Sequence, residues 1–225
     1  MARRTVDLEP AHVDALAALA GCTGWLRTPG GGVVDKAAWI AEVREAWGGC
    51  GLVSRLDGVP VAYVVYAPPA HLPGLGRVPT APVSRDALVL AELWVHPDHR
   101  GGGLGRHLVR SMARELVDRH GPRVPAVETF AGSATRTADA TEPCLRPPGF
   151  CAAVGFTERR AHPVVSRWRL ELRAAVDWRG GVEQAWERLR AGVRPLPGRA
   201  APAGRTSREA PRSTKPREAD LPGLS

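Results

Sequence analysis

Several features that mark particular classes of protein are missing from this sequence of 225 residues. The longest apolar run, residues 59–70, is shorter than the ~20 residues of a membrane-spanning helix and contains prolines. The first residues lack the apolar segment of a secretory signal peptide, because acidic side chains interrupt it. These absences predict a soluble protein without a membrane partner, and we expect a cytoplasmic location.

Cysteine is scarce, and its spacing indicates neither a metal site nor a disulfide framework. No Cys-x-x-Cys pair occurs, and no histidine stands at a zinc-ligand spacing from a cysteine. We therefore expect no metal ion, and we expect all the cysteines to be free thiols in a reducing compartment. They are Cys22, Cys50, Cys144 and Cys151.

The composition is that of a globular protein whose basic excess lies at one end. Hydrophobic residues make up 44% and charged residues 24%, which excludes a fully disordered chain. The net charge is +8, of which residues 1–150 contribute +1 and residues 151–225 contribute +7. Residues 195–225 are rich in Pro, Arg and Ala and poor in large apolar side chains. We predict a domain over 1–176, a peripheral helix at 177–194 and a disordered basic tail at 195–225.

Hydrophobic periodicity and turn residues predict alternating helices and strands over the first 172 residues. The Asp57-Gly58 pair between two apolar runs predicts a β-hairpin. A Pro- and Gly-rich insert at 68–85 has no periodicity, and we expect a lid or a disordered loop there. Helices are expected at 10–20, 35–47, 104–121 and 150–155, and strands at 52–56, 59–66, 86–96, 124–130 and 164–172.

A glycine-rich turn between a strand and a helix is the most informative segment. It runs from Arg100 to Arg106 and brings several backbone N–H groups to the start of the helix at 104–121. Glycines allow a ligand to approach the backbone closely, and a helix N-terminus favours negative charge. The two common nucleotide-binding motifs do not fit, because no Lys-Ser or Lys-Thr follows and position 106 is not glycine. The turn therefore indicates an anion site, most plausibly for a pyrophosphate.

These residues resemble the GNAT family of acetyl-CoA-dependent N-acetyltransferases. Arg100-Gly-Gly-Gly103-Leu-Gly105 matches the family signature Gln/Arg-x-x-Gly-x-Gly/Ala, and Phe150-Cys-Ala-Ala-Val-Gly155-Phe156 is similar to its second block. The order of predicted elements over about 7–173 is also similar. The resemblance implies an α/β (α+β) fold with a GNAT-like central mixed sheet flanked by helices. It also implies acetyl-CoA as co-substrate and a primary amine as acceptor.

Residue by residue, the resemblance implies a cofactor site along one strand and the following turn. The backbone of Leu93, Trp94 and Val95 should pair with the pantetheine arm. The turn should hold the pyrophosphate, with Arg100 and Arg106 as further donors. The implied phosphate-binding residues are Arg100, Gly101, Gly102, Gly103, Leu104, Gly105 and Arg106.

Two carboxylates are candidates for the general base that must deprotonate the amine. Glu92 and Glu128 each stand inside an apolar strand, where desolvation should raise the carboxyl pKa. The resemblance implies a water-mediated base at the position of Glu128. The sequence does not decide between the two, and either carboxylate could instead be exposed at the solvent edge or form a salt bridge.

Two departures from the family pattern bear on the chemistry. Cys151 stands where many members carry a tyrosine that protonates the leaving thiolate, so the thiolate departs without a protein acid or with the thiol as donor. The chain also contains no asparagine, so an asparagine contact to the cofactor found in many members is missing.

The leading prediction is a cytoplasmic N-acetyltransferase that acts on a primary amine by direct attack in a ternary complex. A catalytically weak CoA-binding regulatory domain is one alternative. A basic protein that binds nucleic acid or an acidic partner is the other, although acidic residues dilute the basic tail and no aromatic residues interleave with it. The identity of the amine and the oligomeric state, monomer or homodimer, stay open.

Overall fold

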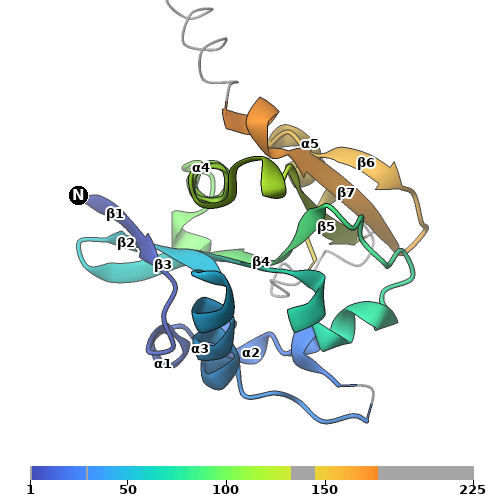
Figure 1. Cartoon of the computed structure of the whole chain (residues 1–225). Helices are drawn as coiled ribbons and strands as arrows, with labels where there is room; N and C mark the ends of the chain where they lie inside the picture. Colours follow the sequence, from blue (N-terminus) through green and yellow to red (C-terminus); the bar gives the residue numbers. More distant parts are fainter. Residues whose placement is uncertain (1, 29, 133–144, 177–225) are drawn as a thin grey trace, which may run out of the picture.

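A computed structural model describes residues 2–28, 30–132 and 145–176. They form a seven-stranded mixed sheet in the order β1-β2-β3-β4-β5-β7-β6 (Figure 1). Neighbouring strands are antiparallel except for β4 and β5, which are parallel. The strands are β1 Arg3–Asp7, β2 Gly51–Leu56, β3 Val59–Ala67, β4 Ala87–Val95, β5 Ala126–Gly132, β6 Thr157–Arg160 and β7 Val165–Glu171.

Helices cover both faces of this sheet. Figure 1 shows α1, α2 and α3 on one face and α4 and α5 on the other. The α-helices are α1 His12–Ala15, α2 Ala17–Gly21, α3 Lys36–Trp47, α4 Leu104–His120 and α5 Pro148–Ala153. The short 3-10 helices are η1 Gly24–Leu26, η2 Pro69–His71, η3 Pro73–Arg77, η4 Pro97–His99 and η5 Gly121–Arg123. The expected mixed sheet flanked by helices is confirmed.

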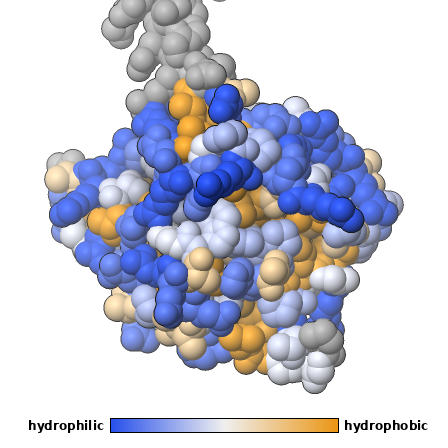
Figure 2. Space-filling model, in the orientation of Figure 1, coloured by the Kyte–Doolittle hydropathy of each residue, from blue (hydrophilic) through white to orange (hydrophobic). Residues whose placement is uncertain are grey.

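Each sheet face has its own apolar core. Leu19, Trp39 and Phe130 belong to the core on the α3 face. Leu108 and Met112 belong to the core on the α4 face, where they cover β2, β3 and β4. Figure 2 shows polar side chains over much of the outside, with apolar surface gathered to the right of the centre. The sheet is thus the middle layer of three, and its strands carry buried side chains on both faces.

Local sequence signals explain most element boundaries. The side chain of Asp35 accepts a hydrogen bond from Ala38 N (2.7 Å) and so caps α3, while Gly48 ends it in the left-handed conformation. Asp57 and Gly58 both have positive φ, as the tight turn between β2 and β3 requires.

Three parts of the expected element order are corrected. The single helix expected at 10–20 is broken into α1 and α2, because Leu16 between them is extended. Strands β1 and β6 were not expected. β6 is exposed along its whole length and lies at the sheet edge, so it lacks the apolar alternation that marks a half-buried strand.

The insert at 68–85 is packed against the core, so the expectation of a lid or a disordered loop is wrong. Leu72, Leu75 and Val83 are buried in the core on the α3 face. Trp39 of α3 donates from its indole nitrogen to His71 O (2.7 Å). The sequence did not predict this packing, because 3-10 turns built on Pro and Gly have no helical or strand periodicity.

Cys22 is disulfide-bonded, so the expectation that all cysteines are free thiols is wrong for this residue. Cys50 and Cys151 are free and buried, while Cys144 lies outside the described residues. The spacing of the cysteines in the sequence could not predict this disulfide, because disulfide formation depends on the distance between two Cα atoms in the folded chain.

The helix expected at 177–194 and the tail expected at 195–225 also lie outside the described residues. Within the described part, no helix is both long and apolar enough to cross a membrane.

The contact between η3 and η1 gives a test of how firmly the insert is packed. A Cβ on Gly74 would overlap the carbonyl oxygen of Gly24, whereas a Cβ on Gly76 would meet nothing within 4 Å. We expect Gly74→Ala to lower the free energy of unfolding by about 1–3 kcal/mol, the usual cost of overpacking. Gly76→Ala, the control, should leave thermal unfolding almost unchanged. Equal melting temperatures for the two variants would contradict this packing.

Candidate active site

The central feature of the site is the divergence of β4 from β5. Their parallel pairing covers Ala87 to Val89 of β4 and ends where Val89 meets Glu128. Beyond that point β4 continues to Val95 paired with β3, while β5 continues to Gly132 paired with β7 on its outer side and with Arg146 on its inner side. The sheet therefore opens into a wedge along the second half of β4.

The inner edge of β4 offers backbone groups to this wedge. His96 N–H donates to Val61 O of β3 (2.8 Å), so His96 faces β3. Strand alternation then directs Trp94 to β3 as well, and it directs the backbone groups of Leu93 and Val95 to the wedge. The Nε of Arg100 donates to Val95 O (3.0 Å), which places this arginine at the outer end of the open edge.

A bulge marks the inner end of the open edge. Val65 of β3 pairs with Glu92, whereas the next residue, Tyr66, pairs with Leu90, so Ala91 has no partner on β3. A bulge adds a residue to one strand and re-aims the neighbouring side chains. Here Ala91 joins the core on the α3 face, on which Glu92 also lies.

The glycine turn lies directly after β4. Gly101 and Gly103 have φ of +79°, which glycine adopts without steric cost. The first N–H groups of α4 have no acceptor within the helix, as at any helix N-terminus. Leu104 and Gly105 are buried, while residues 101–103 and Arg106 are exposed. The turn thus presents backbone donors and the positive end of a 17-residue helix to the mouth of the wedge.

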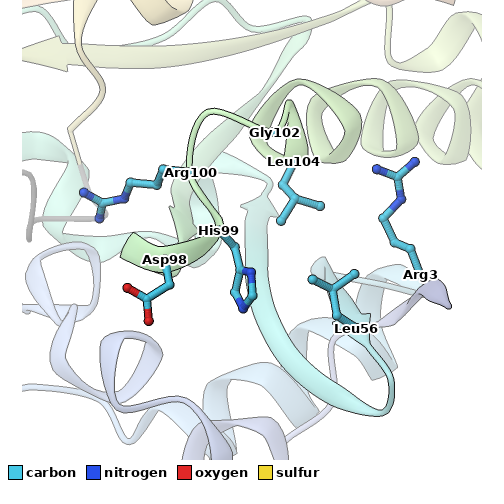
Figure 3. A pocket seen from close by; sticks show the side chains of 7 residues that line it. All are labelled: Arg3, Leu56, Asp98, His99, Arg100, Gly102 and Leu104. Atoms are coloured by element: carbon cyan, nitrogen blue, oxygen red, sulfur yellow. The ribbon is translucent and has the colours of Figure 1, made fainter. Parts of the chain in front are cut away.

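A pocket of about 540 Å³ lies beside the turn. Figure 3 shows His99 and Leu104 between Arg3 on one side and Arg100 on the other, with Arg100 extending away from them and Arg3 extending upward. The lining residues are Arg3, Leu56, Asp98, His99, Arg100, Gly102 and Leu104. The region beside the turn is therefore hollow and flanked by positive charge.

The packing around Gly105 explains why the last position of the signature is a glycine. A Cβ at this position would lie 3.1 Å from the Phe150 ring of α5 and 3.6 Å from Leu93. A side chain there would push α4 away from α5 and from β4. Glycine therefore keeps the two helices close together on either side of the wedge.

Glu92 is buried and paired with a lysine from α3. It is 2% exposed, and its Oε1 lies 2.6 Å from Lys36 Nζ. Lys36 also donates to Leu19 O (2.5 Å) and to Cys22 O. Three acceptors thus hold the ammonium group, and they join β4 to the segment between α2 and η1.

Burial sets the protonation behaviour of this pair. Burial raises the pKa of Glu92 to about 7, against the opposing pull of Lys36, and it lowers the pKa of Lys36 against the pull of Glu92. Glu92 Oε2 accepts no hydrogen bond within the described residues. Tyr63 faces this carboxylate, and burial raises the tyrosine pKa. Glu92 therefore has one oxygen that Lys36 does not bind and that Tyr63 faces, and its raised pKa lies near neutral pH.

Glu128 is completely buried, and both of its oxygens are engaged. Oε1 accepts from Ser84 Oγ (2.6 Å) and lies 3.5 Å from Arg169. Oε2 accepts from Ser84 N (3.2 Å) and lies 3.1 Å from Arg167. These contacts join β5 to β7 and to the end of the insert, at the point where β4 and β5 part.

Arg146, like Lys36, is a site residue that sequence reasoning missed. Its side chain is 2% exposed and reaches across the wedge: Nη2 donates to Ala91 O (2.9 Å) and Nε donates to Phe130 O (3.4 Å). Its backbone forms an isolated parallel bridge with Ala131 of β5. Burial lowers the pKa of Arg146 to about 10, so the guanidinium is charged at neutral pH.

Cys151 is buried on α5 beside this guanidinium. Burial raises the pKa of its thiol to about 11, although Arg146 pulls in the opposite direction. A thiol with this pKa stays protonated at neutral pH and is a poor nucleophile. Among the described residues, no group of His, Cys, Asp and Glu could hold a metal ion.

A comparison with protein families identifies the domain. The model of the acetyltransferase (GNAT) family matches residues 22–138, which is more than half of the chain. The chain belongs to the GNAT acetyltransferase family. It is therefore an acyltransferase, and acetyl-CoA is the co-substrate of this family. No curated protein matches the sequence.

Solved structures of acetyltransferases are similar in fold but distant in sequence, and each of the following covers 76% of this chain. The ribosomal-protein-S18-alanine N-acetyltransferase from Escherichia coli is 16% identical, with a TM-score of 0.45 over 94% of its length. PaiA N-acetyltransferase from Thermoplasma acidophilum, in complex with coenzyme A, is 13% identical, with a TM-score of 0.47 over 99%. An N-acetyltransferase from Staphylococcus aureus Mu50 is 10% identical, with a TM-score of 0.48 over 99%. The family assignment depends on the family model alone.

Of the two buried site residues that sequence reasoning did not predict, Lys36 and Arg146, only Lys36 could have been recognised from the sequence. Lys36 is one of only two lysines among 31 basic residues, in a chain that otherwise uses arginine. A lysine shifts its pKa readily when buried, whereas arginine keeps its charge, so the exception suits a buried partner of a carboxylate. Arg146 left no signal, because it lies in a polar loop next to prolines and its burial depends on the wedge.

The glycine turn can be tested without straining the backbone. The φ of Gly102 is not positive, and a Cβ there would meet only His99 O at 4.0 Å. We expect Gly102→Glu to weaken acetyl-CoA binding by about tenfold or more relative to Gly102→Gln, because a carboxylate repels the pyrophosphate. Calorimetric titration at low and high salt measures both affinities. The gap should narrow with salt, and equal affinities at low salt would contradict an anion site here.

Proposed function

We propose that this GNAT domain transfers the acetyl group of acetyl-CoA to a primary amine by direct attack in a ternary complex. The observation that supports this proposal is the wedge between β4 and β5, which opens next to the glycine turn. An extended arm can pair with the open edge of β4 while its phosphates meet the N-terminus of α4.

The cofactor contacts follow from this geometry. The groups of Leu93 and Val95 that face the wedge would pair with the pantetheine arm, beside Trp94. The turn from Gly101 to Arg106 would bind the pyrophosphate, with Arg100 as a charge-assisted donor. The family resemblance implies a backbone N–H of the Trp94–Val95 region as the donor that polarises the thioester carbonyl. With Glu92 at the inner end of the wedge, the group of Leu93 that faces the wedge would be the nearer donor.

We propose Glu92 as the general base. An alkylammonium has a pKa near ~10.4, so the enzyme must remove a proton before the nitrogen can attack. Glu92 has a raised pKa, a free oxygen and a place at the inner end of the wedge. Glu128 stays the second candidate, but two arginines and Ser84 already occupy its oxygens.

Cys151 would not act as the acid for the leaving group. Its thiol is buried, and burial raises its pKa to about 11. A thiolate is a good leaving group, so the sulfur of CoA would depart without a proton from α5. The missing tyrosine therefore does not by itself favour a merely regulatory CoA-binding domain.

The acceptor is a primary amine on a small molecule or on a protein. Trp25 and Leu26 of the segment after α2 and the packed insert at 68–85 lie on the face of Glu92 and would border its site. Part of the basic charge near the last strands is neutralised, since Arg159 and Arg169 pair with Glu171 and Arg169 also pairs with Asp86. This pairing disfavours a nucleic-acid partner for the described part of the chain.

The remaining parts of the proposal concern the whole protein. We propose a GNAT domain over 1–176, followed by a helix at 177–194 and a disordered basic tail. A cytoplasmic location belongs to the same proposal, although the disulfide at Cys22 is less usual in a reducing compartment.

Replacing Glu92 tests the proposed chemistry. We expect Glu92→Gln to lower thiol release from acetyl-CoA by about 10²–10⁴-fold, the usual contribution of a general base, across a panel of alkylamines, polyamines and lysine peptides. The wild-type rate should rise with pH through about 7, because Glu92 accepts a proton only when it is ionised. The variant should lose this rise while keeping its affinity for acetyl-CoA.

Two further variants serve as comparisons for Glu92→Gln. Glu115→Gln removes another poorly exposed carboxylate with a raised pKa, on α4, and should change turnover less than threefold. A wild-type pH profile in Glu92→Gln would transfer the role to Glu128, which Glu128→Gln then tests. Failure of the wild-type protein to bind acetyl-CoA would overturn the proposed function itself.

A further inference from the structure

A complete ion pair is buried at the carboxylate that we propose as the general base. The side chains of Lys36 and Glu92 are 5% and 3% exposed, and Lys36 Nζ lies 2.6 Å from Glu92 Oε1. Burying two charges is costly, and apolar side chains of similar volume often stabilise a fold equally well or better. Stability is therefore a weak reason for this pair, and its place at the inner end of the wedge points to a role in the reaction.

Backbone carbonyls hold the lysine in one position. Lys36 is the first residue of α3, and its ammonium donates to Leu19 O (2.5 Å) and to Cys22 O as well as to Glu92. An ammonium has three N–H donors, and three acceptors occupy them here. Lys36 therefore cannot turn away from the carboxylate without losing two hydrogen bonds to the backbone.

This contact distinguishes the two oxygens of Glu92. Lys36 binds Oε1, whereas Oε2 accepts no hydrogen bond within the described residues. Glu128 shows the contrast, because serine and arginine groups engage both of its oxygens. A general base must come within hydrogen-bond reach of the proton that it removes. In Glu92 the lysine leaves Oε2 for this purpose.

Three groups from three parts of the chain act on the charge of Glu92. Lys36 acts from α3, Tyr63 from β3 and Arg146 from the segment before α5. Burial raises the carboxyl pKa to about 7, and the lysine has the largest effect in the opposite direction. Tyr63 is uncharged near neutral pH, since burial raises its own pKa. Lys36 is therefore the main group that keeps Glu92 ionised.

We propose that Lys36 is a positioning residue of the acetyl transfer: it fixes Glu92 through Oε1 and keeps the carboxylate ionised at neutral pH, so that Oε2 can take the proton of the acceptor amine. This inference rests on the proposed function, because it requires Glu92 to act as the general base. A base is most effective when its protonation state suits the operating pH. Lys36 acts on the reaction only through Glu92.

The proton transfers balance without a further reactant. The acceptor ammonium gives one proton to Glu92 Oε2, and its nitrogen then forms a bond to the carbonyl carbon of the thioester. The C–S bond breaks with its electron pair on sulfur, and a second proton of the nitrogen passes to the thiolate or to water. Glu92 then loses its proton to water, which restores the ion pair with Lys36.

Replacement of Lys36 should move the pH dependence of the reaction as well as its rate. We expect Lys36→Gln to shift the midpoint of the kcat profile upward by about 1–3 pH units and to lower kcat at neutral pH by about tenfold or more, because loss of a neighbouring cation raises a carboxyl pKa. At alkaline pH the rate should recover toward the wild-type value. Lys36→Arg, which keeps the charge, should have a midpoint close to that of the wild type. One active amine from the panel serves for all variants, so that its own ionisation affects every profile alike.

The ion pair can also be followed without an acceptor amine. The chain contains two lysines, Lys36 and Lys215. The full chain labelled with ¹³C at the lysine Cε therefore gives two NMR signals, and Lys36→Arg identifies one of them by its loss. We expect the Lys36 signal to shift with pH at the midpoint of the wild-type rate profile. In Glu92→Gln this shift should vanish near neutral pH.

A second cation that pairs with a carboxylate outside the wedge provides a matched control. Arg119 lies 3.1 Å from Glu115 and also donates to the backbone carbonyl of Gly48. Arg119→Gln should lower the melting temperature but leave the midpoint of the rate profile and the Lys36 signal unchanged. A merely structural role of Lys36 would likewise lower the rate of Lys36→Gln at every pH without moving its midpoint.

The outcomes separate this inference from the proposed function. An unmoved midpoint in Lys36→Gln overturns the role of Lys36, while loss of the pH-dependent rise in Glu92→Gln keeps Glu92 as the base. Should Lys36→Gln fail to fold, a wild-type Lys36 signal that does not respond at the midpoint of the rate profile overturns the inference. A wild-type rate profile in Glu92→Gln overturns both the base and the role of its partner. Absence of acetyl-CoA binding by the wild-type protein overturns the proposed function itself.

Discussion

Two strands that part within a sheet leave backbone groups without partners, and this constraint shapes the whole site. β4 and β5 pair only up to Val89 and Glu128, after which the inner edge of β4 needs other hydrogen-bond partners. Arg100 and Arg146 satisfy two of its carbonyls. We propose that the groups between them pair with acetyl-CoA, whose pantetheine arm is extended and rich in amides.

The wedge is held open by polar groups on both sides rather than by apolar packing alone. At the closed end of the wedge, Glu128 contacts Ser84, Arg167 and Arg169. These contacts join β5 to β7 and to the insert. On the α3 face, the Lys36–Glu92 pair joins β4 to the segment after α2. Buried ion pairs are costly to break, because removing one partner leaves an uncompensated charge. These networks hold the strands at fixed positions on either side of the gap.

Glu92 and Glu128 stand in strands of similar sequence, yet their carboxylates have different environments. Both Glu92 and Glu128 stand in apolar strands, and sequence reasoning could not separate them. The bulge at Ala91 aligns Glu92 with Lys36 and leaves one of its oxygens free, whereas the register of β5 against β7 surrounds Glu128 with arginines. A shift of one residue in either register would turn that carboxylate to the opposite face of the sheet.

Local sequence determined the fold class, the hairpin at Asp57-Gly58, helices α3 and α4 and the glycine turn, because periodicity, caps and turn residues act over a few neighbouring positions. Tertiary structure alone decided the rest: the break at Leu16, the packing of the insert, the disulfide at Cys22 and the partners of Glu92. Arg146 shows the reason most clearly. Nothing near it in the sequence indicates burial, and its surroundings come from strands that fold beside it from distant parts of the chain.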